Sequence, residues 1–418
     1  RGLDGTIIDW YGRGNENKNF LANDQGTQLL MQEAEQHPGF SFALMMDIGA
    51  NKSCERTPSC NPTENLIEDL NYAYRTYQQS PAYLHYEARP LIFFFGFNGH
   101  GIDWHRVRSR VAGNPIFIFR NSGAFAQEES GGGFSWVSPE EANAKDPMAL
   151  GYLDHYYQTA HRAGTFSLGS AYKGFNDSKA LWGTNRLIQQ QCGQTWLHSI
   201  ANASQFYSEQ QQMIGIQLVT WNDYEEGTEF ETGIANCIQL TSWTKASSVY
   251  WKIEGDESTI DHFTVFISRD GENLMSLADL PAGTHSLDLG RFSLEPGSYT
   301  TYVKAIGKPS LTNQMSEAHE LTISASSGAS AQVTPKALQV YSSPGSMVGS
   351  VVVNIAGNHG PSSDVLIDFG DGTVLTGQSS AEHVYKLPGV YTVMVNVIDS
   401  SGQWSTATME ININTQNN

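Results

Sequence analysis

Seven short apolar runs recur up to about residue 238, with longer segments of mixed character between them. They cover residues 5–9, 42–47, 91–96, 115–120, 133–137, 165–170 and 215–221. Most of these runs lack apolar–polar alternation, which is typical of strands that are buried on both faces. The intervening segments 63–79, 146–162 and 178–203 are long enough for helices. The pattern predicts an α/β fold with a parallel sheet built from βα units.

Polar and aromatic residues cluster where these predicted strands end. They are Asp9, Asp47, Asn98, Arg120, Trp136, Tyr172 and Asp223. A (β/α)8-type barrel places its site on such a rim of strand ends, whereas an open sheet concentrates it at one switch point. The spread over seven strands therefore favours the barrel. Because eight strands are needed for closure and the first run begins almost at residue 1, we expect the first strand to be missing or supplied unusually.

After Cys237 the pattern changes to closely spaced strands separated by turn residues, which is typical of β-sandwiches. We predict a barrel over 1–238, a fibronectin III/Ig-like sandwich over 239–324, a small polar linker over 325–332 and a second sandwich over 333–418. The segments VLIDFGDGT (365–373) and HVYKLPGVYTVMVNV (383–397) resemble the polycystic-kidney-disease (PKD) domain. Their Gly and Pro residues supply tight turns between alternating strands.

The composition narrows the classes of partner. The net charge of −19 argues against a nucleic acid or an anionic lipid surface, and no run of 18 apolar residues is present to span a membrane. We expect a monomer with a polysaccharide partner and no cofactor or metal, whose sandwiches bind a cell-wall or matrix glycan or only act as spacers. The start at Arg1 indicates a removed signal segment or a piece of a longer protein, and secretion is the expectation.

Four cysteines are present. Cys54 and Cys60 flank a short loop near two prolines, a spacing that favours a disulfide over a metal site. Cys192 and Cys237 either form a second bridge or are two buried thiols.

The segment 221–226 places three carboxylates within four residues, directly after a predicted strand. Like charges held close together raise one another's pKa, which is how a carboxyl group stays protonated and acts as a general acid. Glycoside hydrolysis needs one such acid and a second carboxylate. The alternatives are a solvated acidic loop and a calcium site.

Aromatic residues at the strand ends are candidates for stacking on sugar rings, and each could equally pack against helices. They are Trp10, Tyr11, Trp136, Tyr172 and Trp221.

Four segments resemble glycoside hydrolase family 71 and its family 99-like relatives: GLDGTIIDWYG (2–12), PAYLHYEARPLIFFFG (81–96), AYKGFNDS (171–178) and TWNDYEEGTEFETGI (220–234). The resemblance implies a (β/α)8 barrel whose strand-end motif carries the essential carboxylates Asp223 and Glu226. Glu225 stands where that family has glycine. The resemblance also implies a third aspartate in the first segment, and the strand-end position favours Asp9 over Asp4.

The implied activity is the inverting hydrolysis of endo-α-1,3-glucan, in which Asp223 and Glu226 divide the acid and base roles. The side chains suited to hydroxyl recognition are Asp47, Asn98, Arg120, Asn176, Asp177 and Glu225. Two alternatives stay open. One is a family 99-like endo-α-mannanase or mannosidase, although the Glu-Pro-Tyr motif of those enzymes is absent from the sequence. The other is a noncatalytic glycan-binding or adhesion protein.

Overall fold

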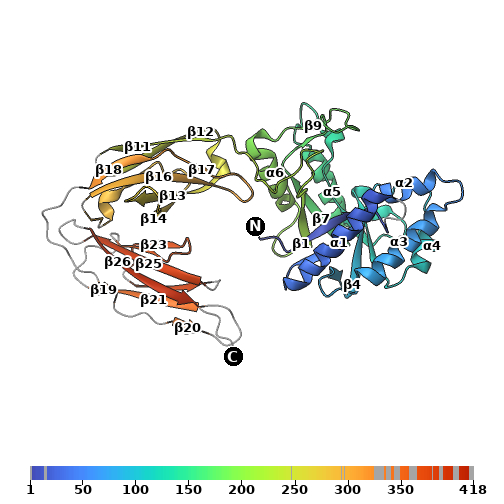
Figure 1. Cartoon of the computed structure of the whole chain (residues 1–418), viewed down its shortest axis with the longest axis horizontal. Helices are drawn as coiled ribbons and strands as arrows, with labels where there is room; N and C mark the ends of the chain where they lie inside the picture. Colours follow the sequence, from blue (N-terminus) through green and yellow to red (C-terminus); the bar gives the residue numbers. More distant parts are fainter. Residues whose placement is uncertain are drawn as a thin grey trace. The chain divides into compact units, whose positions relative to one another are not determined.

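The computed structural model describes residues 2–13, 17–245, 247–292, 294–295, 297–323, 334–335, 340–342, 349–356, 365–378, 380–385, 389–398 and 404–413. The chain forms two compact units (Figure 1): Arg1–Asn236 with Pro309–Leu311, and Cys237–Lys308 with Thr312–Asn418. The predicted linker 325–332 lies outside the described residues.

Seven parallel strands form one sheet in the first unit, in the same order as along the chain. They are β1 (Gly5–Trp10), β2 (Ser41–Asp47), β4 (Arg89–Phe95), β5 (Ile116–Arg120), β6 (Gly132–Phe134), β7 (Phe166–Tyr172) and β10 (Gly215–Val219). Each coincides with a predicted run, so the strand prediction is confirmed. Because β1 and β10 end the order and no eighth parallel strand pairs with them in the described part of the unit, the sheet is a half-barrel and a closed (β/α)8 barrel is not observed.

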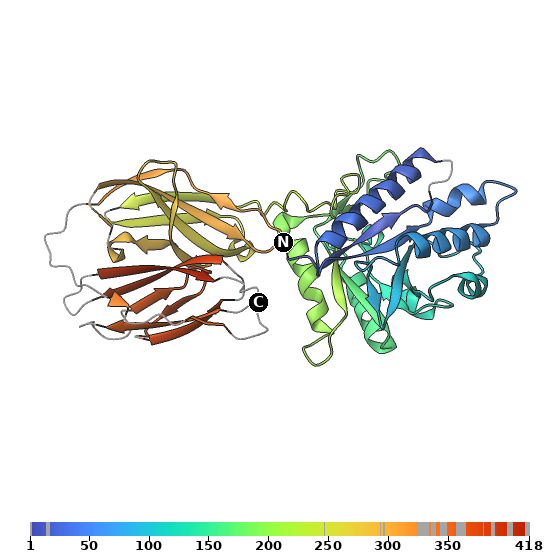
Figure 2. The ribbon, with the colours of Figure 1, turned by 60° about the horizontal axis from the view of Figure 1, so that its bottom comes forward.

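Helices lie around this sheet (Figures 1 and 2). They are α1 (Lys18–Gln36), α2 (Gly49–Glu55), α3 (Pro62–Thr76), α4 (Trp104–Arg110), α5 (Leu150–Ala163) and α6 (Gln194–Asn202). Side chains cap the free N–H groups of three of them: Asn17 for α1, Asn61 for α3 and Asp103 for α4. The predicted helices 63–79 and 146–162 are confirmed as α3 and α5.

The predicted helix 178–203 is wrong over its first half. A hairpin of β8 (Phe175–Asn176) and β9 (Leu187–Ile188) occupies this region, and α6 begins only at Gln194. Cys192 and Gly193 have left-handed backbones, with φ of 53° and 88°, which no continuous α-helix accommodates.

Alternation along the strands divides their side chains between two apolar layers. Phe42, Leu44, Phe94 and Phe117 pack toward the helices, whereas their neighbours in sequence form the core of the other face. That inner core contains Ala43, Met45, Leu91, Phe93, Ile116, Ile118, Phe134 and Phe166. Successive side chains of a strand point to opposite faces, so the inner-facing residues of each strand, here called its inner row, are every second residue. The last residue of each inner row lies at the carboxyl end of its strand, beyond the apolar core.

The second unit begins with a β-sandwich. One sheet contains β11 (Gln239–Lys245), β12 (Ser248–Glu254) and β15 (Ser286–Asp288). The other contains β13 (Ile260–Ser268), β14 (Met275–Pro281), β16 (Gly297–Gly307), β17 (Gln314–Met315) and β18 (His319–Ile323). Trp251, Phe263 and Val303 are buried in the core of this sandwich.

The rest of the second unit has two further sheets within its described residues. One contains β19 (Thr334–Pro335), β20 (Val340–Ser342), β21 (Gly349–Ala356) and β24 (Ser380–Tyr385). The other contains β22 (Val365–Asp368), β23 (Val374–Thr376), β25 (Gly389–Ile398) and β26 (Trp404–Ile413). Ile367, Phe369 and Tyr385 lie in the core, and the Tyr385 hydroxyl donates to the Phe369 carbonyl at 2.8 Å.

The predicted disulfide between Cys54 and Cys60 is confirmed, with the two Cα atoms 5.2 Å apart. Cys192 and Cys237 are also disulfide-bonded. In the first unit, the short strand β3 (His85–Tyr86) pairs with the beginning of β4. None of the helices in the described ranges is long and apolar enough to cross a membrane.

Candidate active site

Three charged side chains stand at the carboxyl ends of inner rows of the half-barrel. Asp9 follows Ile7 on β1, Asp47 follows Met45 on β2, and Arg120 follows Ile118 on β5. Alternation therefore places all three on the inner face, one layer above the apolar core. The Arg120 guanidinium lies 4.2 Å from the centre of the Phe95 ring, which holds it over the end of β4.

The loop after β10 carries the predicted pair and is held by its own hydrogen bonds. The Asp223 N–H donates to the Thr220 hydroxyl at 3.1 Å, and the Asp223 carboxylate accepts the Glu226 N–H at 2.9 Å. The Thr220 and Thr228 hydroxyls lie 2.7 Å apart and close the base of the loop. The Asn176 N–H donates to the Glu226 carbonyl at 2.7 Å. These contacts fix Asp223 and Glu226 relative to β10 and to the β8–β9 hairpin.

Two carboxyl groups from the first and last strands have raised pKa values. Asp9 is exposed at the end of β1, and neighbouring protein atoms partly desolvate its carboxyl group. This desolvation, the nearby Asp47 charge and the more distant Asp223 and Glu226 charges raise the pKa of Asp9 to about 7, against a hydrogen bond from the Tyr11 hydroxyl. For the half-buried Glu226, burial and the Asp223 charge raise the pKa to about 7. Arg186 and Arg120 oppose this rise in the pKa of Glu226.

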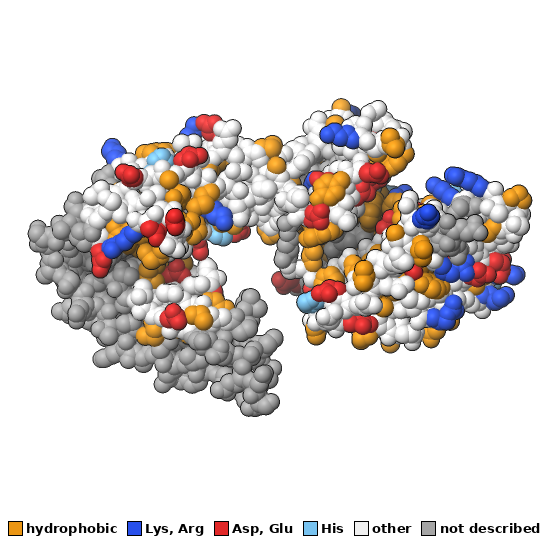
Figure 3. Space-filling model, in the orientation of Figure 1, with side chains coloured by type: hydrophobic (Ala, Val, Ile, Leu, Met, Phe, Trp, Pro, Cys, Tyr) orange, Lys and Arg blue, Asp and Glu red, His pale blue; other side chains and the backbone are white. Residues whose placement is uncertain are grey.

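The effect of the Glu226 charge on Asp9 also bears on the curvature of the sheet. The two residues belong to its opposite ends, β1 and the loop after β10, and the Glu226 charge contributes to the raised pKa of Asp9. Because such an interaction weakens with distance and is screened by water, it is consistent with the curvature of a half-barrel. Figure 3 shows a hollow in the face of this unit, bordered by acidic and apolar side chains.

Tyr11 and Asp47 complete the acidic cluster on the side of β1 and β2. Burial, followed by the charge of Asp9, raises the pKa of the Tyr11 hydroxyl, so this group stays protonated and donates to Asp9. Burial also raises the pKa of Asp47, against the Gly49 N–H, Lys52 and Arg120. Near neutral pH the Tyr11 hydroxyl is therefore protonated and the Asp9 carboxyl group is partly protonated.

Glu225 has a hydrogen-bond partner outside the pair. Its carboxylate accepts a hydrogen bond from the Trp182 indole N–H at 3.3 Å, and it is exposed. Glu229, three residues beyond the pair, is bound by Lys173 at 2.7 Å. The carboxylates of this loop thus have separate partners, and the described residues include no group of three or more His, Cys, Asp or Glu that could hold a metal ion.

Exposed aromatic rings flank the acidic loop. Trp221 keeps 43% of its surface exposed, and Trp182 and Tyr224 keep 50% and 55%. Sequence reasoning identified Trp221 but missed Trp182 and Tyr224. Trp182 lies in the segment that was expected to be helical, and its signal was a tryptophan among small and polar residues.

Three predicted site residues are corrected by their burial. Trp10 is 1% exposed and its indole N–H donates to Asp24 at 3.0 Å. Tyr172 is fully buried, and its hydroxyl donates to the carbonyl groups of Met148 and Ala149. Neither ring has a free face for a sugar. Asp177 is also fully buried and is paired with Arg186 at 2.8 Å, so it is not available to a substrate.

The other predicted residues lie in varied places around the strand ends. Trp136 is half-buried and packs edge-on against Phe95, with ring centres 5.3 Å apart. Asn98 is exposed in the loop after β4. Asn176 is exposed in β8, and its side-chain oxygen accepts the Ser178 N–H. Asp4 precedes β1, at the opposite end of the strand from Asp9.

Arg186 is a further residue that sequence reasoning missed. Asp177 accepts hydrogen bonds from both its N–H and its Nε, and Glu140 lies 3.1 Å from its Nη1. The Arg186 charge lowers the pKa of Glu226. Nothing in the local sequence distinguishes this arginine, because its role depends on the hairpin that brings it back toward β10.

Comparison with solved structures gives low overall similarity. The PKD1 domain of the Vibrio cholerae metalloprotease PrtV is 22% identical, with 19% of this chain and 94% of that chain covered and a TM-score of 0.16. The PKD1 domain of Vibrio anguillarum Epp is 19% identical, with 20% and 100% covered and a TM-score of 0.16. A two-domain fibronectin type-III segment of chicken tenascin is 13% identical, with 42% and 97% covered and a TM-score of 0.15.

A family model gives a definite result for the end of the chain. Residues 342–413 match the model of the PKD domain. The matched range contains the strands from β21 to β26, and it agrees with the resemblance seen in the sequence. This part of the chain is therefore a PKD domain.

Proposed function

We propose that the first unit is a glycoside hydrolase similar to family 71, and that it cleaves an uncharged extracellular polysaccharide, with endo-α-1,3-glucan as the first candidate. The observation that carries the proposal is Glu226, a half-buried carboxyl group with a pKa near 7 beside Asp223. A carboxyl group that is protonated near neutral pH is what the departure of a sugar leaving group requires.

The roles follow from the charges. Glu226 donates its proton to the glycosidic oxygen, and Asp223 accepts a proton from the water that attacks the anomeric carbon. Displacement by this water inverts the anomeric centre, as the family resemblance implies. The ionised forms of Asp9 and Asp47 supply negative charge for the positive charge that develops on the sugar ring. Arg120 keeps this cluster from being wholly protonated, because it favours the ionised form of both Asp47 and Glu226.

The exposed rings suit an uncharged sugar chain. Trp182, Trp221 and Tyr224 offer apolar surface beside the acidic loop, and the C–H faces of sugars pack on such rings. The disulfides are consistent with an oxidising, extracellular location.

The test is hydrolysis of purified polysaccharides by the full chain, with α-1,3-glucan, α-mannan and other neutral glycans compared. Glu226→Gln and Asp223→Asn should each lower kcat/KM by about 10²-fold or more. Glu225→Gln is the matched control, because its carboxylate faces Trp182 and should change kcat/KM by less than about threefold. NMR of the first product reports the anomeric configuration.

Binding of these glycans without release of product would exclude the hydrolase and favour a noncatalytic binding protein. Release of product from α-mannan alone would favour a family 99-like activity. Full activity in both Glu226→Gln and Asp223→Asn would exclude these two residues as the catalytic acid and base.

A further inference from the structure

A second pair of aromatic rings lies on the β-sandwich of the second unit, outside the acidic site. Trp243 on β11 is 43% exposed, and it stands directly opposite the half-buried Tyr250 on β12. The two ring planes are within 13° of parallel, and their centres are 5.8 Å apart. Both rings point away from the core, because Ser242 and Trp251, which neighbour them in sequence, are buried.

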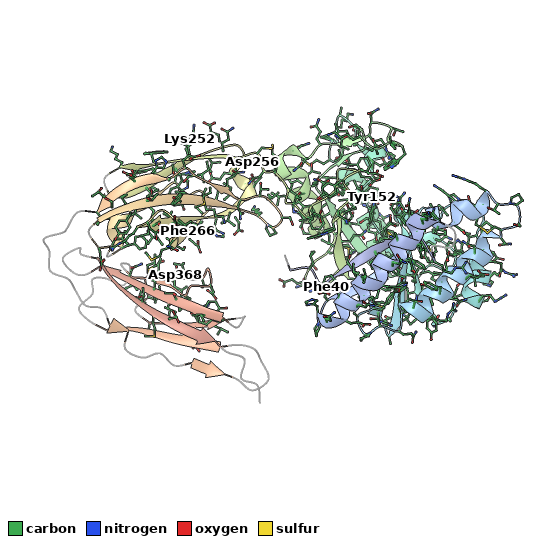
Figure 4. The ribbon with its side chains drawn as sticks, in the orientation of Figure 1. Phe40, Tyr152, Lys252, Asp256, Phe266 and Asp368 are labelled. Carbon is green, nitrogen blue, oxygen red and sulfur yellow. A yellow bond between two sulfur atoms is a disulfide. The ribbon has the colours of Figure 1, made fainter. Side chains whose placement is uncertain are left out.

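The surroundings of this pair are polar. Thr241 and Lys252 form the adjacent cross-strand pair on the same outer face, and Lys252 is paired with Glu254 at 3.0 Å. Lys245, two residues beyond Trp243, is exposed on this face as well. Figure 4 shows Lys252 pointing away from the sandwich. The face thus has an apolar centre with hydrogen-bonding groups beside it.

We propose that Trp243 and Tyr250 form a binding site for a neutral polysaccharide, separate from the acidic site of the first unit. Covering the exposed part of a large aromatic side chain is favourable, because it removes apolar surface from water. Sugar rings present flat C–H faces for the aromatic planes and hydroxyl groups for Thr241 and Lys252. The net charge of −19 disfavours an acidic ligand. Only the choice of α-1,3-glucan as a probe rests on the proposed function.

The experiment measures how much full-length protein is bound by particles of α-1,3-glucan, cellulose or chitin. All proteins carry Glu226→Gln, so that the probe is not consumed. Trp243→Ala and Tyr250→Ala should weaken binding to at least one of these glycans, roughly tenfold or more for Trp243→Ala. Leu274→Ala is the matched control, because Leu274 is 43% exposed on the same sandwich, as Trp243 is, and it should bind as the parent does.

A second variant separates binding from folding. Trp243→Phe keeps an aromatic face and should retain part of the affinity. If the loss of affinity came from unfolding of the sandwich instead, Trp243→Phe and Trp243→Ala would both lower the unfolding temperature and both lose affinity. Unchanged binding by Trp243→Ala and Tyr250→Ala, or no binding of any of the three particles by the parent, would overturn the proposal. Binding that depends on a protein retained in the particles and is lost after they are deproteinised would also overturn it.

The proposed function is assessed separately with Glu226 restored. If the chain hydrolyses soluble oligosaccharides, Trp243→Ala should not change that rate, because the site acts only on attachment. Trp243-dependent binding without hydrolysis of any glycan would uphold this inference and exclude the hydrolase. Hydrolysis of a glycan, together with binding that does not depend on Trp243, would support the hydrolase and exclude the binding site at Trp243 and Tyr250.

Discussion

At the scale of single residues, the candidate site depends on the balance of charges around Glu226. Burial and the Asp223 charge raise the pKa of Glu226, and the Arg186 and Arg120 charges lower it. The sum is a group that is about half protonated near pH 7, which allows it to donate a proton and regain it in each cycle. Both arginines should therefore influence the pH dependence of the reaction.

Arg120→Met should move the alkaline limb of the kcat/KM profile upward by roughly one pH unit. Loss of a nearby positive charge destabilises the ionised form of Glu226, so the acid stays protonated to higher pH. Lys52→Met is the control, because Lys52 acts on Asp47 and is not among the charges that shift Glu226. Rate measurements across pH 5–9 decide the matter, and a limb that stays in place or moves downward would contradict this account of Arg120.

Glu226→Gln should stabilise the first unit at pH 8. Between the ordinary pKa of about 4.3 and the folded value near 7, the folded state holds a proton that the unfolded state has released. Stability from this group therefore falls as the pH rises through that window. The gain at pH 8, after allowance for solvent screening, should be about 1–2 kcal/mol. Calorimetry of the variant and the parent should show the difference at pH 8 and none near pH 4.

Strand alternation explains which ring predictions were wrong. Tyr11 and Asp9 are two residues apart and share the inner face, whereas Trp10 between them points to the helices. Whether a side chain faces the site therefore depends less on its closeness to the strand end than on which face of the sheet its position points to. Tyr172 and Asp177 could not be excluded in this way, because the carbonyl groups that bind Tyr172 and the hairpin that brings Arg186 to Asp177 are set by tertiary structure.

At the scale of elements, the β8–β9 hairpin is held in place by the pair of Asp177 and Arg186. Asp177 is fully buried and accepts N–H groups from Thr184 and Arg186 as well as the guanidinium. The hairpin carries both Arg186 and the segment with Trp182, so its order affects the charge near Glu226 and the exposed ring.

Asp177→Asn should loosen this hairpin and cost about 1–3 kcal/mol, because a charged acceptor is lost while the arginine stays. We expect faster limited proteolysis within 178–190 and a higher KM for the glycan. Glu140→Gln is the control, since Glu140 is an exposed partner of the same arginine and should change stability by less than about 0.5 kcal/mol. Equal proteolysis of the parent and Asp177→Asn would contradict this role.

Gly370→Ala should destabilise the PKD domain more than Gly372→Ala does. Both glycines have left-handed backbones, with φ of 77° and 90°. A Cβ at Gly370 would lie 2.6 Å from the Thr392 carbonyl oxygen, whereas a Cβ at Gly372 would meet nothing within 4 Å. Backbone strain of about 1 kcal/mol or more applies to both, and the steric overlap adds to it only at Gly370. Unfolding temperatures of the two variants measure the difference, and equal values would contradict it.

The sequence was a good guide to strands and a poor one to the hairpin. Runs such as FALMMD and LIFFFG are apolar at every position but one or two, and this pattern predicts a strand that is buried on both faces. The segment 178–203 has no such pattern, and its turns depend on residues that tolerate positive φ, including Gln191 and Cys192. Those conformations are set by tertiary contacts and by a disulfide, which local propensity does not report.

At the scale of the whole molecule, the first unit includes a short segment from far along the chain. Leu311 is buried with Trp196, Phe230 and Ile234, and the Trp196 indole N–H donates to the Pro309 carbonyl at 3.0 Å. The Ile234 N–H donates to the Ser310 carbonyl at 2.8 Å. A boundary placed near residue 238 from the change of pattern could not include this segment.

Leu311→Ala should lower the stability of the first unit by about 2–4 kcal/mol, because it removes buried methyl groups and leaves a cavity. Leu274→Ala, at an exposed position, should leave it unchanged within about 0.5 kcal/mol. Calorimetry of the full chain measures both. A protein that ends at residue 236 should be less stable than the full chain, and equal stability would show that 309–311 contributes nothing.

The placement of Asp9 and Glu226 at opposite ends of the sheet has a consequence for how the proposed hydrolase acquires activity. The two groups are separated by more than 200 residues, and both are in place only when β1 and β10 have joined the sheet. Contacts of such long sequence separation form late, because the entropy of the intervening chain must be lost first. During synthesis, β1 and β10 cannot both join the sheet until almost the entire first unit has left the ribosome. Recovery of hydrolysis after unfolding should therefore lag behind the recovery of helical signal, and enzymatic activity would serve as the reporter of the last step in folding.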